Sequence, residues 1–274
     1  MSFILLTVHV SEELSDVLKA LLSETGFDAF LDHDTGFEAS IEKDLYEQQA
    51  VEQVISPFTT ANQITWTAKE VAKQNWNKLW ESNFHPIEIS KDCYIRAAFH
   101  PPMPGYTHQL VITPKMSFGT GHHATTSLMI QHQLMIDHKG KSLIDIGCGT
   151  GVLAIMGGKL GASSLIGCDI EDWSVENALE NAEMNAISME VFEGTVEQIE
   201  GENLYDIVLA NINLNVHKKS MASYIKILKP NGHLVLSGFY ESDIPTVQAL
   251  ADQLGVQLFS TKVQDKWVSL VYTK

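Results

Sequence analysis

The stretch 143–155, "LIDIGCGTGVLAI", decides the fold of most of this chain. An apolar run typical of a strand ends there, and Gly147, Gly149 and Gly151 form a turn before a helix. Glycines at this place let the backbone pass close to a ligand at the carboxyl edge of a parallel sheet. The spacing is G-x-G-x-G. A dinucleotide loop needs a third glycine where Val152 stands, so NAD is disfavoured.

A second motif, "LIGCDIED" at 165–172, ends another apolar strand with an acid. Asp169 follows Gly147 by 22 residues, where a carboxylate can accept hydrogen bonds from both hydroxyls of a ribose. A glycine loop with such an acid, but without a dinucleotide loop, favours an adenosine whose tail is not a phosphate. S-adenosylmethionine fits this description. The plainer alternative is that the glycines serve tight packing and Asp169 is an ordinary residue at a strand end.

A third motif, "DIVLANINL" at 206–214, places Asn211 at the end of a further strand. An amide oxygen and exposed carbonyls there can hold an amine by accepting its N–H bonds. A methyl acceptor must be neutral, and a lysine loses its proton at pH 7 at a cost of about 4.6 kcal/mol, from a pKa near 10.4. A nearby cationic sulfonium lowers that cost. The rest of catalysis is alignment for in-line displacement, which makes Asn211 the candidate catalytic residue.

Strands and helices alternate with short connections from residue 124 onward, which predicts a parallel sheet covered on both faces. The last two strands are too close for a crossover and predict an antiparallel hairpin. Residues 92–114, rich in proline, are expected to be an extended lead-in. The expected helices are 124–137, 152–160, 173–185, 217–228 and 243–254, and the expected strands are 142–147, 164–170, 189–194, 205–212, 232–239, 256–263 and 266–273.

The first 68 residues predict a separate small domain of order β-α-β-β-α-β, which is ferredoxin-like. Its expected elements are a strand at 3–10, a helix at 11–26 capped by Ser11, strands at 27–34 and 36–44, a helix at 45–56 ended by Pro57, and a strand at 62–71. Residues 69–85 are expected to form a linker helix in which Trp76 and Trp80 share one face. Residues 86–274 form the second domain.

The charge of this 274-residue chain is strongly acidic, with a formal net charge of −16. Residues 1–68 hold twelve carboxylates and two lysines, which is most of that charge. Direct nucleic-acid binding through general basicity is therefore excluded. The acidic domain is either a solvated surface or a docking surface for a basic partner. No apolar run has membrane-spanning length, and three unpaired cysteines indicate a reducing compartment.

The segment 118–126, "FGTGHHATT", precedes the first site strand. A phosphate loop would follow a strand and carry lysine where His122 stands, and adjacent histidines alone lack the spaced partners of a metal site. We therefore expect a glycine lid that includes Gly119 and ends in a helix N-terminus. Thr125 and Thr126 could bond the methionine carboxylate there, and Phe118 could cover the methionine tail. The histidines would orient the loop or be plain surface residues.

These segments in this order and spacing, "MSFGTGHHATT", "IDIGCGTGVLAI", "GCDIED" and "LANINLNVH", resemble bacterial ribosomal protein L-eleven (L11) methyltransferases. The "NWNKLW" stretch at 75–80 and the acidic first domain are also similar to that family, so the resemblance covers essentially the whole chain. The glycine and acid motifs are shared by all class I methyltransferases. The "FGTGHHATT" segment is the family-specific one.

The resemblance implies an α/β fold, with a seven-stranded, Rossmann-like class I methyltransferase domain after the ferredoxin-like one. It implies a cytoplasmic monomer that methylates lysine side chains and the N-terminal amine of L11, free or on the ribosome, and releases S-adenosylhomocysteine. The first domain would recognise L11. Matched by motif, the cofactor contacts fall on Thr126, Gly147, Asp169 and Asn211, with Phe118, Gly119, Thr125 and Gly149 beside them.

One departure concerns the loop after Asn211, which reads "NINL" where many amino methyltransferases have Asn-Pro-Pro-aromatic. The missing aromatic wall suits an alkyl amine better than a planar amide. Three alternatives stay open: a class I methyltransferase with another protein or small-molecule substrate, a non-catalytic adenosyl-binding adaptor, and a nicotinamide dehydrogenase. The sequence leaves the modified amines, the number of methyl groups and the roles of His122, His123 and His217 undetermined.

Overall fold

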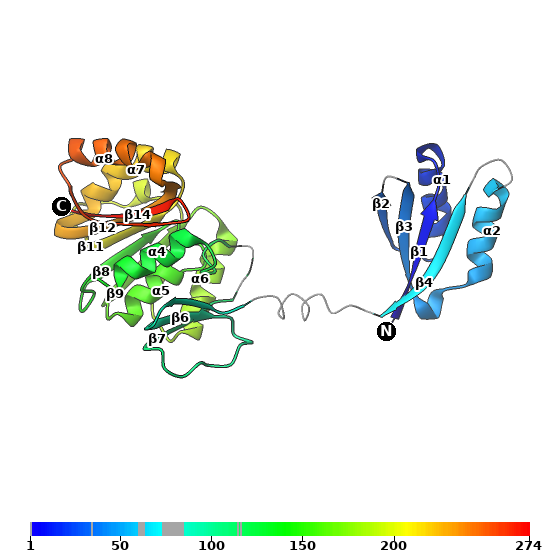
Figure 1. The fold of residues 1–274 in the computed structure, drawn as a ribbon, viewed down its shortest axis with the longest axis horizontal. Coiled ribbons are helices and arrows are strands. Elements are labelled where there is room, and N and C mark those ends of the chain that lie inside the picture. Colours follow the sequence, from blue (N-terminus) through cyan, green and yellow to red (C-terminus); the bar gives the residue numbers. More distant parts are fainter. Residues whose placement is uncertain (1, 34, 60–63, 73–84, 114, 116) are drawn as a thin grey trace. The chain divides into compact units, whose positions relative to one another are not determined.

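The computed structural model describes residues 2–33, 35–59, 64–72, 85–113, 115 and 117–274. The chain divides into two compact units, Met1–Phe84 and His85–Lys274 (Figure 1). Most of the predicted linker helix, including Trp76 and Trp80, lies outside the described residues. No helix within the described ranges is long and apolar enough to cross a bilayer.

The N-terminal unit is a four-stranded antiparallel sheet with two helices packed against it (Figure 1). The sheet order is β2-β3-β1-β4, so β1 lies between β3 and β4. Alternate residues of β1 such as Leu6 and Val8 are buried with Leu18, Leu22 and Ile55 of the helices, which makes one core. The elements are β1 (Ser2–His9), α1 (Glu12–Ser23), β2 (Ala29–His33), β3 (Gly36–Glu42), the short 3-10 helix η1 (Lys43–Leu45), α2 (Gln48–Thr59) and β4 (Thr65–Ala72).

The element order matches the prediction, but several element ends differ, and two of these differences overturn a stated expectation. Pro57 does not end α2, because the helix continues to Thr59 with the proline in its last turn. A proline there costs the last turn one backbone hydrogen bond, and the helix ends two residues later. Strand β4 extends to Ala72, so residues 69–72 are strand and not the start of a linker helix. Ser11 occupies the N-cap position of α1 but makes no side-chain capping bond.

The C-terminal unit contains a seven-stranded mixed sheet of order β10-β9-β8-β11-β12-β14-β13. The first five strands are parallel, and β14 runs antiparallel to both neighbours, as the predicted final hairpin requires. The strands are β8 (Ser142–Ile146), β9 (Ser164–Asp169), β10 (Glu190–Glu193), β11 (Tyr205–Asn211), β12 (Leu228–Tyr240), β13 (Gln257–Gln264) and β14 (Trp267–Thr273).

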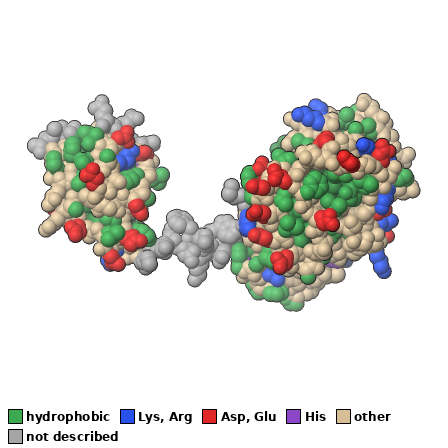
Figure 2. All heavy atoms as spheres, turned by 180° about the vertical axis from the view of Figure 1, so that it is seen from behind, with side chains coloured by type: hydrophobic (Ala, Val, Ile, Leu, Met, Phe, Trp, Pro, Cys, Tyr) green, Lys and Arg blue, Asp and Glu red, His purple; other side chains and the backbone are tan. Residues whose placement is uncertain are grey.

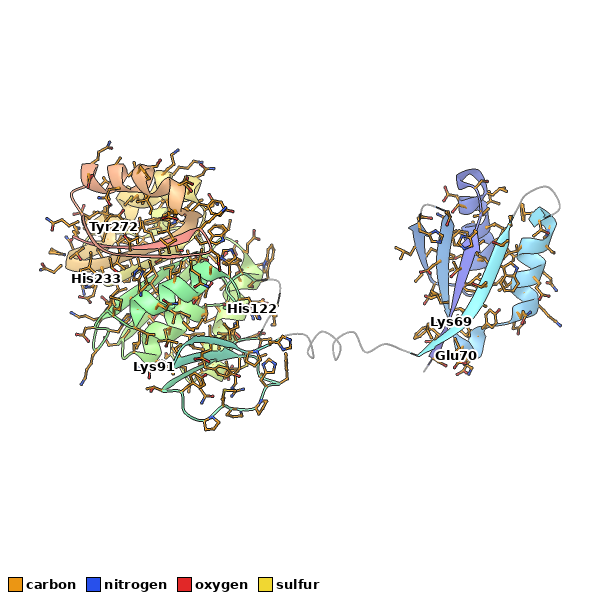
Figure 3. The ribbon with its side chains drawn as sticks, in the orientation of Figure 1. Lys69, Glu70, Lys91, His122, His233 and Tyr272 are labelled. Carbon is orange, nitrogen blue, oxygen red and sulfur yellow. The ribbon has the colours of Figure 1, made fainter. Side chains whose placement is uncertain are left out.

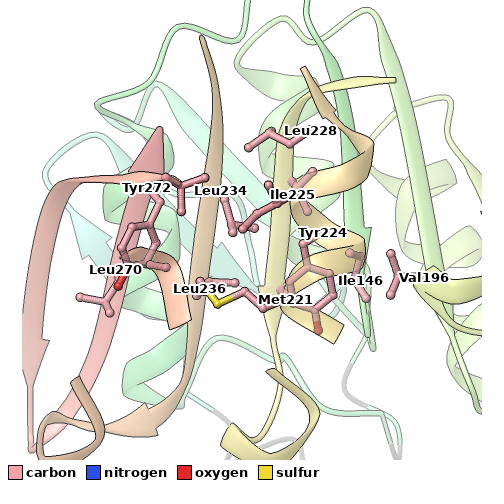
Figure 4. Packing of buried hydrophobic residues seen from close by; sticks show 14 of the residues in the cluster. Ile146, Val196, Met221, Tyr224, Ile225, Leu228, Leu234, Leu236, Leu270 and Tyr272 are labelled. Atoms are coloured by element: carbon pink, nitrogen blue, oxygen red, sulfur yellow. The ribbon is translucent and has the colours of Figure 1, made fainter. Parts of the chain in front are cut away.

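Two hydrophobic cores cover the two faces of this sheet, as expected for a buried parallel sheet. On one face Met221 and Tyr224 of α7 and Val247 of α8 pack against strand residues such as Leu236 and Leu270 (Figure 4). On the other face α4, α5 and α6 contribute Met129, Ile155 and Ala182, among others. The helices are α4 (Ala124–Gln133), α5 (Val152–Lys159), α6 (Asp172–Met184), α7 (Leu214–Ile227) and α8 (Ile244–Gln253), with the 3-10 turns η2 (Val196–Gln198) and η3 (Glu241–Asp243).

The segment expected to be an extended lead-in forms a small sheet of its own. Strands β5 (Ile87–Ser90), β6 (Cys93–Arg96) and β7 (His108–Val111) pair in the order β5-β6-β7, antiparallel and then parallel. Its buried Ile95 and Leu110 join the core on the α5 face of the large sheet. The clustered prolines between β6 and β7 concealed a parallel pair that local patterning could not predict.

Other differences are shifts of helix and strand ends. Helix α7 begins at Leu214 and not at 217, because the Asn213 side chain accepts the Val216 N–H and caps it at 3.2 Å. Helix α4 ends at Gln133, four residues earlier than predicted. Strand β12 begins at Leu228, four residues earlier than predicted.

Candidate active site

A cavity of about 590 Å³ opens at the carboxyl edge of the large sheet, where β9, β8 and β11 end. The order in which strands are added to the sheet reverses at β8: β9 and β10 lie on one side of β8, and β11 lies on the other. Ligands of open α/β sheets bind at such a switch point. Five predicted site residues line the cavity: Phe118, Gly147, Gly149, Asp169 and Asn211.

The glycine loop brings three segments of the chain into contact. All three of its glycines have positive φ angles, 67° at Gly147, 54° at Gly149 and 76° at Gly151. A Cβ on Gly147 would lie 2.6 Å from Ile212 Cγ2, and a Cβ on Gly149 would lie 2.3 Å from the Phe118 carbonyl oxygen. The glycines therefore admit the Asn211 loop on one side and the predicted lid on the other.

Asp169 ties the end of β9 to this loop. Its Oδ2 accepts the Gly149 N–H at 2.9 Å, and its Oδ1 accepts the Glu171 N–H at 3.2 Å. These bonds fix the carboxylate at the cavity wall, and each oxygen keeps a further lone pair. The geometry suits the predicted contact with a ribose, which stays a prediction.

Asp145, in β8 before the glycine loop, was not among the predicted site residues. Its side chain is fully buried, its Oδ2 accepts the Ala154 N–H at 3.2 Å, and its Oδ1 has no partner. Burial raises the pKa of this carboxyl to about 7, and the charge of Asp169 adds to the rise. An acid inside the apolar run "LIDIG" was the available signal.

The predicted lid is bound to the glycine loop by two hydrogen bonds from one residue. The Thr150 N–H donates to the Phe118 carbonyl at 2.9 Å, and Thr150 Oγ1 donates to the Gly119 carbonyl at 2.7 Å. Gly119 does not line the main cavity. It borders a neighbouring hollow of about 420 Å³, which is also lined by Ser117, Phe118, Thr120, His122 and His123. Figure 3 labels His122 on this loop, well away from His233 and Tyr272.

Asparagines of α6 hold the chain that leads to the lid. Asn185 accepts the Val111 N–H at 2.9 Å and donates to the Val111 carbonyl at 2.7 Å. One turn earlier, Asn181 accepts the Thr113 N–H at 2.8 Å and donates to the Thr150 carbonyl at 2.9 Å. A further turn earlier, Asn177 is fully buried, and neither polar atom of its side chain has a partner. These bonds hold the backbone at Val111 and Thr113, which leads to the predicted lid, in one position.

Thr125 and Thr126 lie in the first turn of α4, as predicted, but do not line the cavity. Both are buried, and Thr126 Oγ1 has no partner. His123 is the N-cap residue of α4: its Nδ1 lies 3.3 Å from the Thr125 N–H and 2.8 Å from Thr125 Oγ1. Its ring packs edge-on against Phe118 and Trp267. His123 thus orients the loop.

Asn211 ends β11, and its Oδ1 is buried without a hydrogen-bond partner. It lines the same cavity as Phe118 and the residues that follow Asp169, among them Ile170 and Trp173, whose side chains are exposed. An apolar cavity edged by a carboxylate and an unpartnered amide fits an adenosyl group with a short cationic tail. Fold and site together define a class I S-adenosylmethionine-dependent methyltransferase.

The particular family follows from comparison with known proteins. The profile of the family described as ribosomal protein L11 methyltransferase (PrmA) matches residues 3–274, and the chain belongs to this family. It is similar to the ribosomal protein L11 methyltransferases of Bacteroides thetaiotaomicron, 38% identical over the full length of both chains, and of Porphyromonas gingivalis, 39% identical over 97% of this chain and 94% of that one.

A solved structure agrees on the fold. The crystal structure of ribosomal protein L11 methylase from Lactobacillus delbrueckii subsp. bulgaricus is 24% identical. It covers 70% of this chain and 98% of its own, with a TM-score of 0.64. An α/β architecture with a large mixed sheet is common to both.

Proposed function

We propose that this protein transfers methyl groups from S-adenosylmethionine to amines of ribosomal protein L11, namely lysine side chains and the N-terminal amine. The observation that carries the proposal is the unpartnered Oδ1 of Asn211 in the same cavity as Gly147 and Asp169. An acceptor for N–H bonds is thereby placed beside a cradle for an adenosyl group. Membership of the family supplies the identity of the substrate.

Four groups of residues would hold the cofactor. Asp169 accepts from the ribose hydroxyls, and the loop at Gly147 and Gly149 lies close to the sugar and the tail. The methionine carboxylate would lie near the N-terminus of α4, and it would reach the buried hydroxyls of Thr125 and Thr126, which do not line the cavity, only after a shift of the preceding loop. Thr126 Oγ1, buried and unpartnered, gains an acceptor in this arrangement. Phe118 and Gly119 cover the tail.

The bound cofactor supplies an electrophilic methyl group on a cationic sulfonium. Asn211 accepts an N–H of the neutral amine and aims its lone pair at that methyl carbon. A nitrogen–carbon bond forms as the sulfur–carbon bond breaks, and the amine proton passes to water. Asp169 is bound by the Gly149 and Glu171 amides and Asp145 is fully buried, so they hold and orient and do not remove this proton.

The N-terminal unit would be a ferredoxin-like recognition domain, and the large unit a seven-stranded class I methyltransferase domain. The order β4-β1-β3-β2 with two helices on one face supports the first assignment. Lys19 lies between Asp16 and Asp32, at 2.8 and 2.9 Å, and Lys43 pairs with Glu70 at 2.8 Å, so both lysines of residues 1–68 are neutralised. Acidic side chains outnumber basic ones on the face of this unit that Figure 2 shows. Such a surface suits a basic ribosomal protein.

The working form would be a cytoplasmic monomer that meets L11 free or on the ribosome. The deciding experiment is mass spectrometry of ribosomal proteins from cells with and without this protein. Methyl groups on L11 that vanish with the protein are expected. An unchanged L11, together with a lost methyl group on another protein, would instead favour a class I methyltransferase with a different protein substrate.

A further inference from the structure

The loop that carries Asn211 rests directly on the backbone of the neighbouring strand β12. Asn211 pairs with Ser237, and the Ile212 N–H donates to the Ser237 carbonyl at 3.2 Å. The next residue of β12, Gly238, has a φ of +99°, and a Cβ there would lie 2.1 Å from the Ile212 carbonyl oxygen. The pairing of β12 with β14 is irregular at this same place, between Ser237 and Phe239. The carbonyl of Ser237 is therefore the support on which the loop sits.

A buried histidine binds that same carbonyl. His217, near the start of α7, is fully buried, and its Nε2 lies 2.9 Å from the Ser237 oxygen. A carbonyl oxygen only accepts, so Nε2 must carry the proton. The ring packs edge-on against Phe239 and Tyr224, with centroid distances of 5.4 and 6.0 Å, so it has little freedom to turn.

Burial also determines the charge of this ring. It lowers the pKa of His217 to about 4, and the backbone of Ser237 and Ile212 offsets only part of the lowering. The imidazole is therefore neutral at the pH of cells. Its single N–H proton lies on Nε2 and is donated in the hydrogen bond to the Ser237 carbonyl. His217 supplies a fixed hydrogen bond and no charge. The ring does not line the cavity, so it acts on the loop and not on a bound ligand.

We infer that His217 is a positioning residue, which holds the Asn211 loop at the reaction site through the Ser237 carbonyl. The inference rests on the proposed role of Asn211 at the acceptor amine. His217 binds the carbonyl from the side of α7 while Ile212 binds it from the loop, so helix, strand and loop share one atom. Loss of the histidine donor should let the loop shift. Because misplacement by a fraction of an ångström slows an aligned displacement, turnover should fall more than affinity.

The test compares three variants with the full-length protein. His217→Phe keeps a ring against Phe239 and Tyr224 but removes the donor, and His217→Gln restores an N–H of similar reach. His132→Phe is the matched control. His132 is likewise buried, has a pKa of about 4, and bridges Ser269 of β14 and Ser260 of β13, at 2.9 and 3.2 Å, so these two hydrogen-bond partners are not residues of the Asn211 loop.

Two readouts are measured: steady-state methylation of L11, and hydrogen exchange of the Ile212 amide without any ligand. For His217→Phe we expect kcat to fall about tenfold with the KM for S-adenosylmethionine within about threefold, and exchange to speed up at least about tenfold. His217→Gln should recover most of kcat. His132→Phe should change neither readout, although it should lower the melting temperature, as His217→Phe should.

Normal turnover by folded His217→Phe would overturn the inference, and so would an equal loss of kcat in His132→Phe. Unchanged exchange of the Ile212 amide would overturn it too, because the loop would not need the histidine. A wild-type protein that transfers no methyl to L11 would refute the proposed function instead. The exchange comparison would still decide whether His217 holds the loop.

Discussion

The two units of the chain differ in how many buried side-chain polar atoms lack a hydrogen-bond partner. In the N-terminal unit, Ser15 Oγ is the one buried side-chain polar atom without a partner among the described residues. The C-terminal unit holds many within its described part, including atoms of Thr126, Asp145, Asn177 and Asn211. Such groups cost about 1–3 kcal/mol each when nothing binds them. Of these residues, Asn211 and Tyr224 line the site cavity, where a polar ligand could satisfy them, whereas the N-terminal unit presents its charges on the surface.

Separation of the two units is the strongest test of this difference between them. A protein of residues 85–274 keeps the cavity, the glycine loop, Asp169 and Asn211, so its affinity for S-adenosylmethionine should stay within about threefold. Its kcat/KM for L11 should fall at least about a hundredfold, because a basic substrate would have lost its acidic dock. Calorimetry and an isotopic methyl-transfer assay measure the two quantities. Equal activity of the short and full-length proteins would refute the docking role.

Salt sharpens the same comparison. If the dock is electrostatic, the KM of the full-length protein for L11 should rise steadily with salt, since the Debye length shrinks to about 3 Å at 1 M. The short protein should show a much weaker dependence. A full-length KM indifferent to salt would leave docking in place but make it apolar.

A smaller loss is expected from Asn211→Ala. Turnover should drop about thirtyfold, because the acceptor amine loses the oxygen that aims it, while the cofactor affinity should drop less. A single-turnover assay and calorimetry separate the two effects. Asn215→Ala is the control, an exposed asparagine on the same helix-bearing segment, and should behave as wild type. Normal turnover of Asn211→Ala would remove the residue from the reaction.

Asp169→Ala should weaken S-adenosylmethionine binding about tenfold or more, because the ribose hydroxyls lose a charged acceptor. The Gly149 and Glu171 amides lose their acceptor as well, which loosens the loop. Asp172→Ala is the matched control: this exposed carboxylate begins α6 and does not line the cavity. Calorimetry that shows unchanged affinity for Asp169→Ala would remove the ribose assignment.

Most helices and strands could be predicted from the sequence, but few of the contacts between residues far apart in the chain could. Apolar periodicity and glycine spacing are local, so the strands before Gly147 and Asp169 and the helix after the lid were predicted correctly. The sheet β5-β6-β7 depends on pairing across eleven intervening residues, which no local pattern records. The asparagines of α6 and the bond from His217 to Ser237 likewise join residues far apart in sequence. Thr125 and Thr126 lie in the first turn of the predicted helix, but they are buried and do not line the cavity, which no local pattern indicated.

The smallest predicted effect is a pH dependence confined to the C-terminal unit. The pKa of Asp145 rises from 3.8 to about 7 on folding, so the folded state binds more protons than the unfolded state between these values. Stability from this group is therefore greatest below pH 4 and is lost as pH rises through 7. Asp145→Asn keeps an acceptor for the Ala154 N–H and removes the titration. Between pH 6 and 7.5 the stability of this variant relative to wild type should increase by about 1 kcal/mol, or 2–4 °C in melting temperature.

Two internal controls accompany this measurement. His132 and His217, with pKa values near 4, stabilise the fold increasingly as pH rises toward 6.5, and they do so equally in both proteins. Subtraction of the two melting curves therefore isolates Asp145. The transition of the N-terminal unit should not differ between the proteins, since each unit has its own core and can unfold separately. A constant difference in melting temperature from pH 6 to 7.5 would mean that Asp145 is already charged in the folded protein. Its unpartnered Oδ1 would then be satisfied by something other than a proton.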